Sequence, residues 1–167
     1  MTVATTTHSA DETGLLAQRV GALLRAGDVV VLAGELGVGK TVFAKGVARA
    51  LGITEPVVSP SFTIVRQYEG TVPLVHVDVY RIDHVQELYD IGLDELIGDD
   101  SVTLVEWGDR VSTILPPDRL EVVIAADEHD DDARQFRFDA VGRAWMARRD
   151  ALTAIVEAPP ESAPGPC

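Results

Sequence analysis

The chain has 167 residues, of which 46% are hydrophobic, and this length and apolar content predict a single globular domain. Its 27 acidic and 14 basic side chains give a formal net charge of −13, which argues against independent nucleic-acid binding because a phosphate backbone would be repelled. The chain lacks the ~20-residue apolar run of a membrane span and an N-terminal signal core, and its one cysteine is the last residue, so we expect a cytoplasmic protein without a disulfide.

The first predicted elements are a short tail, a helix and a strand. Residues 1–10 are rich in threonine and carry little charge, and we expect them to be disordered. Ser9 and Glu12 have the spacing of a capping box, which predicts a helix that stops at Gly27. Residues 28–33 then form a continuous apolar run after Asp28, as in a strand buried on both faces of a parallel sheet.

The most informative motif follows this strand directly. Residues 34–41 read Gly-Glu-Leu-Gly-Val-Gly-Lys-Thr and match the phosphate-binding loop G-x-x-x-x-G-K-T. Its glycines leave backbone N–H groups open to a polyphosphate, Lys40 would place a positive charge beside the β- and γ-phosphates, and the Thr41 hydroxyl would hold Mg²⁺. A helix is predicted over residues 41–51, with Gly52 as its stop, so that its N-terminus faces the phosphates. Strand, loop and helix in this order predict a nucleotide-binding fold.

The rest of the chain predicts hairpins, short helices and a second core strand. Strand-like runs at 63–68 and 72–80 flank a Glu-Gly-Thr turn and predict a hairpin. The later predicted elements are short helices at 85–89 and 93–97, a strand at 102–105, a second hairpin from 120–125 and 134–139 at a sheet edge, and a helix from about 142 to 157. We expect residues 158–167, which hold four prolines, to be a disordered tail.

These elements predict an α/β fold of the P-loop NTPase type. It would be a three-layer sandwich with a mostly parallel central sheet and antiparallel edge hairpins. Residues 11–157 would form its single ATPase domain.

Two carboxylates are candidates for holding the metal ion and the attacking water. Asp78 lies on a predicted strand where His76, Asp78 and Tyr80 share one face, which suggests that this face lines a site. Glu106 follows the apolar run 102–105, at the carboxyl end of a strand, where the ligand crevice of such sheets lies. Glu106 is our first choice for the general base or water-orienting residue. The structural alternatives are a half-solvated strand at Asp78 and a turn cap at Glu106.

Three further segments have a functional and a plain structural interpretation. Hydroxyls at Ser59, Ser61 and Thr63 could contact Mg²⁺ or phosphate, as in the segment that senses the γ-phosphate in GTPases, although spacing alone favours a Ser-Pro turn. Trp107 could pack in the core or against the site. The acidic run 127–132 is interpreted as a solvated hairpin tip rather than a metal site. The chain has no N-K-x-D segment, which favours ATP over GTP.

With these motifs in place, the chain resembles the TsaE family, small bacterial ATPases needed for threonylcarbamoyl modification of adenosine in tRNA. The resemblance runs from about residue 13 to 138. It is carried, in the family's order, by the phosphate loop at 34–41, Ser-Pro-Ser-Phe-Thr at 59–63, His-x-Asp-x-Tyr-Arg at 76–81 and Val-Glu-Trp at 105–107. The loop is common to many families, whereas the last two elements together with it are specific. Glu35 and Val38 stand where the family often has Asp and Ala, at positions that offer backbone more than side chain.

The resemblance implies a P-loop α/β fold, binding of ATP and Mg²⁺, slow hydrolysis, and partnership with TsaD and TsaB. The tRNA would be reached only through that complex, which agrees with the acidic charge. Catalysis is assigned to Lys40, Asp78 and Glu106, and the metal to Thr41, Asp78 and Glu106. The nucleotide would be held by Glu35, Leu36, Gly37, Val38, Gly39, Lys40, Thr41, Val42 and Trp107.

The residues leave two other functions open. A small-molecule P-loop kinase is suggested by Asp78 at a strand end, where some kinases keep an acceptor-binding carboxylate. Such kinases usually have an arginine-bearing lid, and Arg134 and Arg137 alternate on a predicted strand, which makes a poor lid. A nucleotide-gated binding module with negligible turnover differs from an ATPase only in rate. An arginine finger would come from Arg81 or from the partner.

Overall fold

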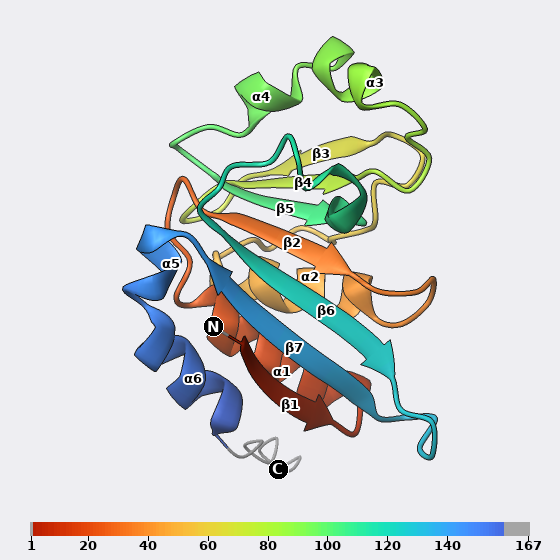
Figure 1. Cartoon of the computed structure of the whole chain (residues 1–167), viewed down its shortest axis with the longest axis vertical. Helices are drawn as coiled ribbons and strands as arrows, with labels where there is room; N and C mark the ends of the chain where they lie inside the picture. The colour runs from red at the N-terminus through yellow and green to blue at the C-terminus, as the bar shows by residue number, and fades with distance from the viewer. Residues whose placement is uncertain (1, 159–167) are drawn as a thin grey trace.

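The computed structural model describes residues 2–158, except the side chain of Val85, and Figure 1 shows its helices and strands. Within this range the strands are β1 (Thr2–Thr7), β2 (Val29–Ala33), β3 (Val65–Tyr68), β4 (Leu74–Asp78), β5 (Val102–Glu106), β6 (Arg119–Ala126) and β7 (Arg134–Val141). The helices are α1 (Ala10–Gly21), α2 (Lys40–Ala50), α3 (Val85–Asp90), α4 (Leu93–Leu96), α5 (Arg143–Met146) and α6 (Arg149–Glu157), with a 3-10 turn η1 (Gly108–Val111).

All seven strands belong to one sheet, in the order β1-β7-β6-β2-β5-β4-β3. The four inner strands β6, β2, β5 and β4 run parallel to one another, while β3, β7 and β1 pair antiparallel with their neighbours. The predicted hairpins are therefore present as β3–β4 and β6–β7. The continuous apolar run of β2 places it in the middle of the sheet, where both of its faces are covered.

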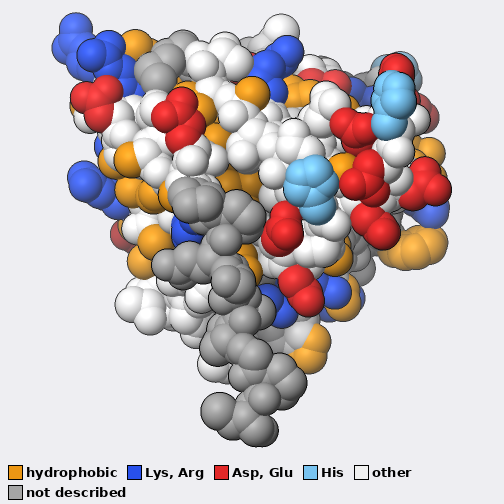
Figure 2. All heavy atoms as spheres, turned by 90° about the horizontal axis from the view of Figure 1, so that it is seen from below, with side chains coloured by type: hydrophobic (Ala, Val, Ile, Leu, Met, Phe, Trp, Pro, Cys, Tyr) orange, Lys and Arg blue, Asp and Glu red, His pale blue; other side chains and the backbone are white. Residues whose placement is uncertain are grey.

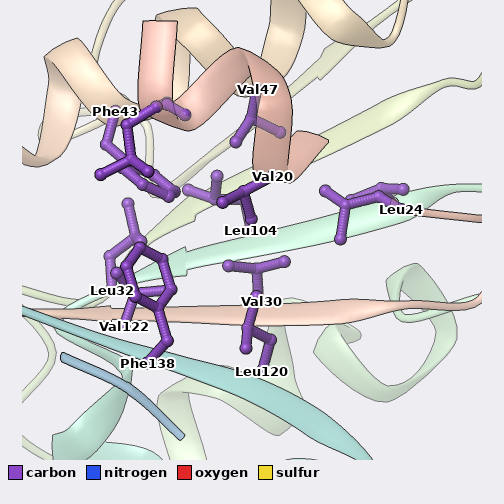
Figure 3. Close-up of a cluster of buried hydrophobic side chains, with 14 of the residues drawn as sticks. Val20, Leu24, Val30, Leu32, Phe43, Val47, Leu104, Leu120, Val122 and Phe138 are labelled. Carbon is purple, nitrogen blue, oxygen red and sulfur yellow. The ribbon is translucent and has the colours of Figure 1, made fainter. Parts of the chain in front are cut away.

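Apolar layers lie on both faces of the sheet and confirm the three-layer prediction. Val30 and Leu32 of β2 face a core that also includes side chains of α1, α2 and α6, whereas Val29 and Val31 face a second core shared with α3, α4 and η1. Figure 3 shows Val20 of α1 and side chains of α2 packed over the first face. The parallel strands are thus held rigidly between helices, and their carboxyl ends meet along one edge of the core.

The prediction of a disordered N-terminus was wrong, because Thr2–Thr7 form β1. This strand pairs antiparallel with β7, from Thr2 opposite Asp139 to Thr7 opposite Arg134. Val3 and Thr7 are buried while Thr2, Ala4 and Thr6 are exposed, which is the alternation of a half-buried strand, and β-branched threonine suits it. β1 also occupies the otherwise unpaired edge of β7. The hairpin β6–β7 consequently lies inside the sheet. The prediction that this hairpin lies at a sheet edge was therefore wrong.

Two predicted helices end or break earlier than expected. The N-cap of α1 is Ser9, whose hydroxyl accepts from the backbone N–H of Glu12 at 3.1 Å, but the helix ends at Gly21 rather than near Gly27. The predicted C-terminal helix is divided into α5 and α6 at Arg148. The Arg148 guanidinium binds both carboxylate oxygens of Asp28, at 2.6 and 2.7 Å, and this ion pair fixes the chain where the two helices meet. The predicted disordered tail, apart from residue 158, lies outside the described residues.

The contact between α1 and α2 leaves no room for a side chain at Gly46. A Cβ there would lie 2.5 Å from the Cβ of Ala17 and 2.5 Å from the carbonyl oxygen of Gly14. We expect Gly46→Ala to lower the free energy of unfolding by about 1–3 kcal/mol, because the two helices must separate. Gly14→Ala is a matched control, since its Cβ would meet only a side-chain nitrogen of Arg49, at 3.7 Å. Urea unfolding that showed equal losses for both variants would contradict this tight contact.

Candidate functional site

The phosphate loop leaves β2 and enters α2 through glycines with backbone angles that other residues rarely adopt. Gly34 has φ 145° and Gly39, the N-cap of α2, has φ 115°. A Cβ on Gly34 would lie 2.4 Å from the carbonyl oxygen of Ile124, so this glycine lets the loop pack directly on β6. A Cβ on Gly39 would meet no heavy atom within 4 Å. The loop is therefore anchored at its start and open at the helix N-terminus, as anion binding requires.

The ammonium group of Lys40 lies folded over this loop. Its Nζ donates to the carbonyl oxygens of Gly34, at 2.8 Å, and Glu35, at 2.7 Å, and lies 3.9 Å from the centre of the Trp107 ring. Burial lowers the pKa of Lys40, while the nearby carboxylates of Glu106, Asp78 and Asp109 oppose this decrease. The positive charge thus stands at the loop, enclosed by backbone oxygens and an aromatic face.

A hollow of about 300 Å³ opens beside the loop and brings most of the predicted site residues together. Its lining includes Leu36, Gly37, Gly39, Lys40, Thr41, Val42, Asp78, Glu106 and Trp107. Two predicted nucleotide-binding residues do not line it. Val38 is buried in the first apolar core, and Glu35 contributes its carbonyl oxygen to Lys40.

The two candidate carboxylates lie at the carboxyl ends of neighbouring parallel strands. Asp78 ends β4 and Glu106 ends β5, and the two residues are partners in the strand register. Both are 3% exposed. Every residue of β4 is buried, which rules out the half-solvated strand. Carboxylates are seldom buried this deeply, and two of them side by side make this wall of the hollow a candidate site of chemistry.

The segment 59–63 is fastened to Asp78 by side-chain hydroxyls. Ser59 Oγ and Ser61 Oγ each donate to Oδ2 of Asp78 at 2.9 Å, and both serines line the hollow. Thr63, by contrast, is exposed and is not part of the hollow. Ile64, directly after this segment, has φ 67°, a strained angle for a β-branched residue. Sequence spacing favoured a plain Ser-Pro turn, and the fold instead places two of its hydroxyls on a site carboxylate.

Trp107 and Tyr80 form an aromatic wall at the mouth of the hollow. Trp107 adopts φ 61°, directly after β5, and its ring lies 4.9 Å from that of Tyr80. Tyr80 lies beyond the end of β4 and is 41% exposed. Arg110 donates to the carbonyl oxygen of Tyr80 at 2.8 Å and lies near both rings. Trp107 therefore lines the hollow and also packs against the second apolar core, so both of its predicted positions are combined in one side chain.

Sequence reasoning gave no role to two contacts that the fold creates. His76 is fully buried, and its Nε2 lies 2.8 Å from Oε1 of Glu106. Arg134, at the start of β7, donates from Nε to the carbonyl oxygen of Val38 at 3.0 Å and ties the β6–β7 turn to the phosphate loop. These pairs are 30 and 96 residues apart in the chain, so only the shared face of His76 and Asp78 hinted at the first of them.

The acidic run 127–132 forms the turn between β6 and β7. Asp127 accepts from the backbone N–H of His129 at 2.9 Å, and this bond contributes most to lowering the pKa of Asp127. The view from below in Figure 2 shows Asp, Glu and His side chains gathered toward one side of that face. Most of the run is exposed, as the solvated-turn interpretation expects.

Within residues 2–158, none of the helices has the length and apolar content of a membrane span.

Comparison with known proteins gives a consistent result. A family model described as "Threonylcarbamoyl adenosine biosynthesis protein TsaE" matches residues 7–136. The chain is 44% identical over 140 residues to the tRNA threonylcarbamoyladenosine biosynthesis protein TsaE of Bacillus subtilis, which covers 83% of this chain and 86% of that protein. It is 40% identical over 136 residues to the TsaE protein of Streptomyces coelicolor, covering 78% of this chain and 91% of that one.

The fold is also shared with a solved structure. The crystal structure of Bacillus subtilis YdiB matches with a TM-score of 0.79 and 38% sequence identity, over 92% of this chain and 95% of that chain. The family match includes the phosphate loop and both buried carboxylates, so the likeness extends to the candidate site. The chain therefore belongs to the TsaE family, the family of threonylcarbamoyl adenosine biosynthesis proteins.

Proposed function

We propose that this protein is a Mg²⁺-dependent ATPase that acts in threonylcarbamoyl modification of tRNA adenosine. One observation carries the hydrolytic part: a phosphate loop and two buried carboxylates, Asp78 and Glu106, line the same hollow. The names of its relatives support the tRNA part. We also propose a cytoplasmic location, because tRNA is modified there.

The two sides of the phosphate loop suit the two ends of ATP. The backbone N–H groups at the start of α2 would bind the phosphates. The reacting γ-phosphate would then face Asp78 and Glu106, while the nucleoside would lie on the opposite side of the loop. We assign the nucleoside to a second hollow of about 170 Å³, which shares loop residues with the first and is also lined by Ser9, Thr13 and Asp132. On binding, Lys40 would exchange its two carbonyl partners for phosphate oxygens, which are stronger acceptors.

The donor set in the hollow fits Mg²⁺. Thr41 offers a hydroxyl and Asp78 and Glu106 offer carboxylates, and this hard cation prefers such oxygen ligands. Asp78 already accepts hydrogen bonds from two serine hydroxyls through Oδ2. This oxygen therefore faces polar groups and not the apolar core. When bound, Mg²⁺ would neutralise charge that develops on the phosphates.

The residues around the hollow support slow hydrolysis by the protein alone. Glu106 would accept a proton from the attacking water, and Lys40 would stabilise charge on the transferred phosphoryl group. Among the described residues, no arginine lines the hollow. Arg81, the internal candidate for an arginine finger, lies over the Phe62 ring at 4.3 Å. We therefore propose that the partner protein supplies the group that stimulates ATP hydrolysis.

We propose TsaD and TsaB as these partners, with tRNA bound by the complex and not by this acidic chain. The net charge of −13 supports docking on protein rather than on nucleic acid. We do not favour a small-molecule kinase, because Arg134 is tied to the phosphate loop and is not on a lid.

The direct test is ATP turnover measured with and without the purified TsaD–TsaB complex. We expect slow ATP hydrolysis by the protein alone. The rate should increase clearly with the complex, because the partner would supply the group that stimulates hydrolysis. In a strain that lacks the gene, threonylcarbamoyladenosine in tRNA should disappear and return when the gene is restored. An unchanged turnover with the complex, or unchanged modification in the deletion strain, would contradict the proposal.

A further inference from the structure

A buried histidine contacts the carboxylate that we propose as the general base. His76 lies two residues before Asp78 on β4 and is fully buried. Its Nε2 reaches across to β5 and lies 2.8 Å from Oε1 of Glu106, whose side chain is also almost fully buried. The contact joins two neighbouring parallel strands beneath the hollow, because both residues point to the same face of the sheet.

The geometry assigns the proton of this hydrogen bond to the histidine. An ionised carboxylate can only accept hydrogen bonds, so the imidazole donates through Nε2–H. Its Nδ1 has no hydrogen-bond partner, which a lone pair tolerates better than an N–H group would. An imidazole that donates through Nε2 satisfies both observations. Oε1 of Glu106 is thereby fixed toward β4, and Oε2 is left for the hollow.

We propose that His76 is a positioning residue that holds the Glu106 carboxylate in the orientation needed for ATP hydrolysis. The inference rests on the proposed ATPase function. Glu106 has three rotatable bonds, and a general base must lie within hydrogen-bond reach of the proton that it takes. A single hydrogen bond to Oε1 restricts those rotations without touching the nucleotide.

Packing alone does not explain a histidine at this position. Its register partner on β5 is Leu104, and Leu74 and Leu104 both belong to the first apolar core. A leucine at residue 76 would extend that core, but it would leave the buried Glu106 carboxylate without its hydrogen-bond donor, which is destabilising. The hydrogen-bond donor at residue 76 is therefore explained by the Glu106 carboxylate that it holds.

Three substitutions separate a positioning role from a packing role. His76→Leu removes the donor and keeps the position apolar. His76→Gln keeps a donor, because the glutamine amide nitrogen is as far along the side chain as Nε2. His76→Asn is the matched control, since its amide is polar but ends near the position of Nδ1, too short to reach Glu106.

We expect kcat for ATP to fall about 10- to 100-fold in His76→Leu and His76→Asn, and to stay within about threefold of wild type in His76→Gln. The affinity for ADP should stay within about twofold in all three, because His76 does not line the hollow. Equal turnover in folded wild-type and His76→Leu proteins, or equal losses in the Asn and Gln variants, would overturn the proposal.

A double-mutant cycle tests whether His76 acts through Glu106. His76→Leu combined with Glu106→Gln should turn over no more slowly than Glu106→Gln alone, since no carboxylate is left to position. Losses that multiply would show that His76 acts in another way and would overturn the proposal.

A spectroscopic readout does not depend on ATP turnover. In ¹⁵N-labelled protein, the buried Nε2–H of His76 should give a slowly exchanging signal that His76→Leu removes and Glu106→Gln shifts. If wild-type protein did not hydrolyse ATP, the proposed function would fail, and this signal would decide by itself whether His76 holds Glu106. A missing signal, or one that Glu106→Gln left unchanged, would overturn the contact.

Discussion

Replacing Lys40 with alanine should reduce ATP turnover about 10²- to 10³-fold, because the transition state loses a positive charge enclosed in the site. Lys40 is 5% exposed and stands over the loop that would bind the phosphates, so water cannot easily take its place. Nucleotide binding should weaken as well, since the β- and γ-phosphates lose the same partner. Phosphate release and the increase in melting temperature caused by ADP measure the two effects.

The protein should stay folded without this lysine. Burial lowers the pKa of Lys40, so its charged form is less favourable in the folded chain than in the unfolded chain, and removing it relieves that cost. Lys45, the only other lysine in the sequence, is exposed on the same helix, and Lys45→Ala is the matched control. A folded Lys40→Ala protein that hydrolysed ATP like the control would refute the proposed site.

Replacing Glu106 with glutamine should reduce kcat about 10²- to 10⁴-fold and leave ATP bound. Glutamine has the same shape and its side-chain oxygen can still accept from His76, but it cannot take a proton from water. Single-turnover experiments with excess enzyme separate this chemical step from binding. We expect the affinity for ATP to change by less than about threefold, because the phosphates are held mainly by the loop and Lys40.

Two further variants locate the role of Glu106. Glu69→Gln changes an exposed glutamate in the β3–β4 turn and should be silent. Asp78→Asn tests the second carboxylate, whose loss should mainly raise the Mg²⁺ concentration needed for activity. If Asp78→Asn lost the chemical step while Glu106→Gln kept it, the two roles would be exchanged.

The two hairpins and the central strand were predictable because each has a local pattern. A continuous apolar run, a glycine loop and a helical repeat lie next to one another around residues 28–51 and need no distant partner. The N-terminal strand was missed for the opposite reason. Thr2–Thr7 have little apolar content, and what makes them a strand is the unpaired edge of β7, which lies more than 100 residues away.

The fold class, the phosphate loop and the two carboxylates could be predicted because they depend on residues that are neighbours in the chain. The folded chain was needed to see that Asp78 and Glu106 meet at one wall and that Ser59 and Ser61 bind Asp78. It also revealed the contact of His76 with Glu106. These contacts join segments on different strands and loops, and their distances are set by strand register, which no local pattern of residues encodes.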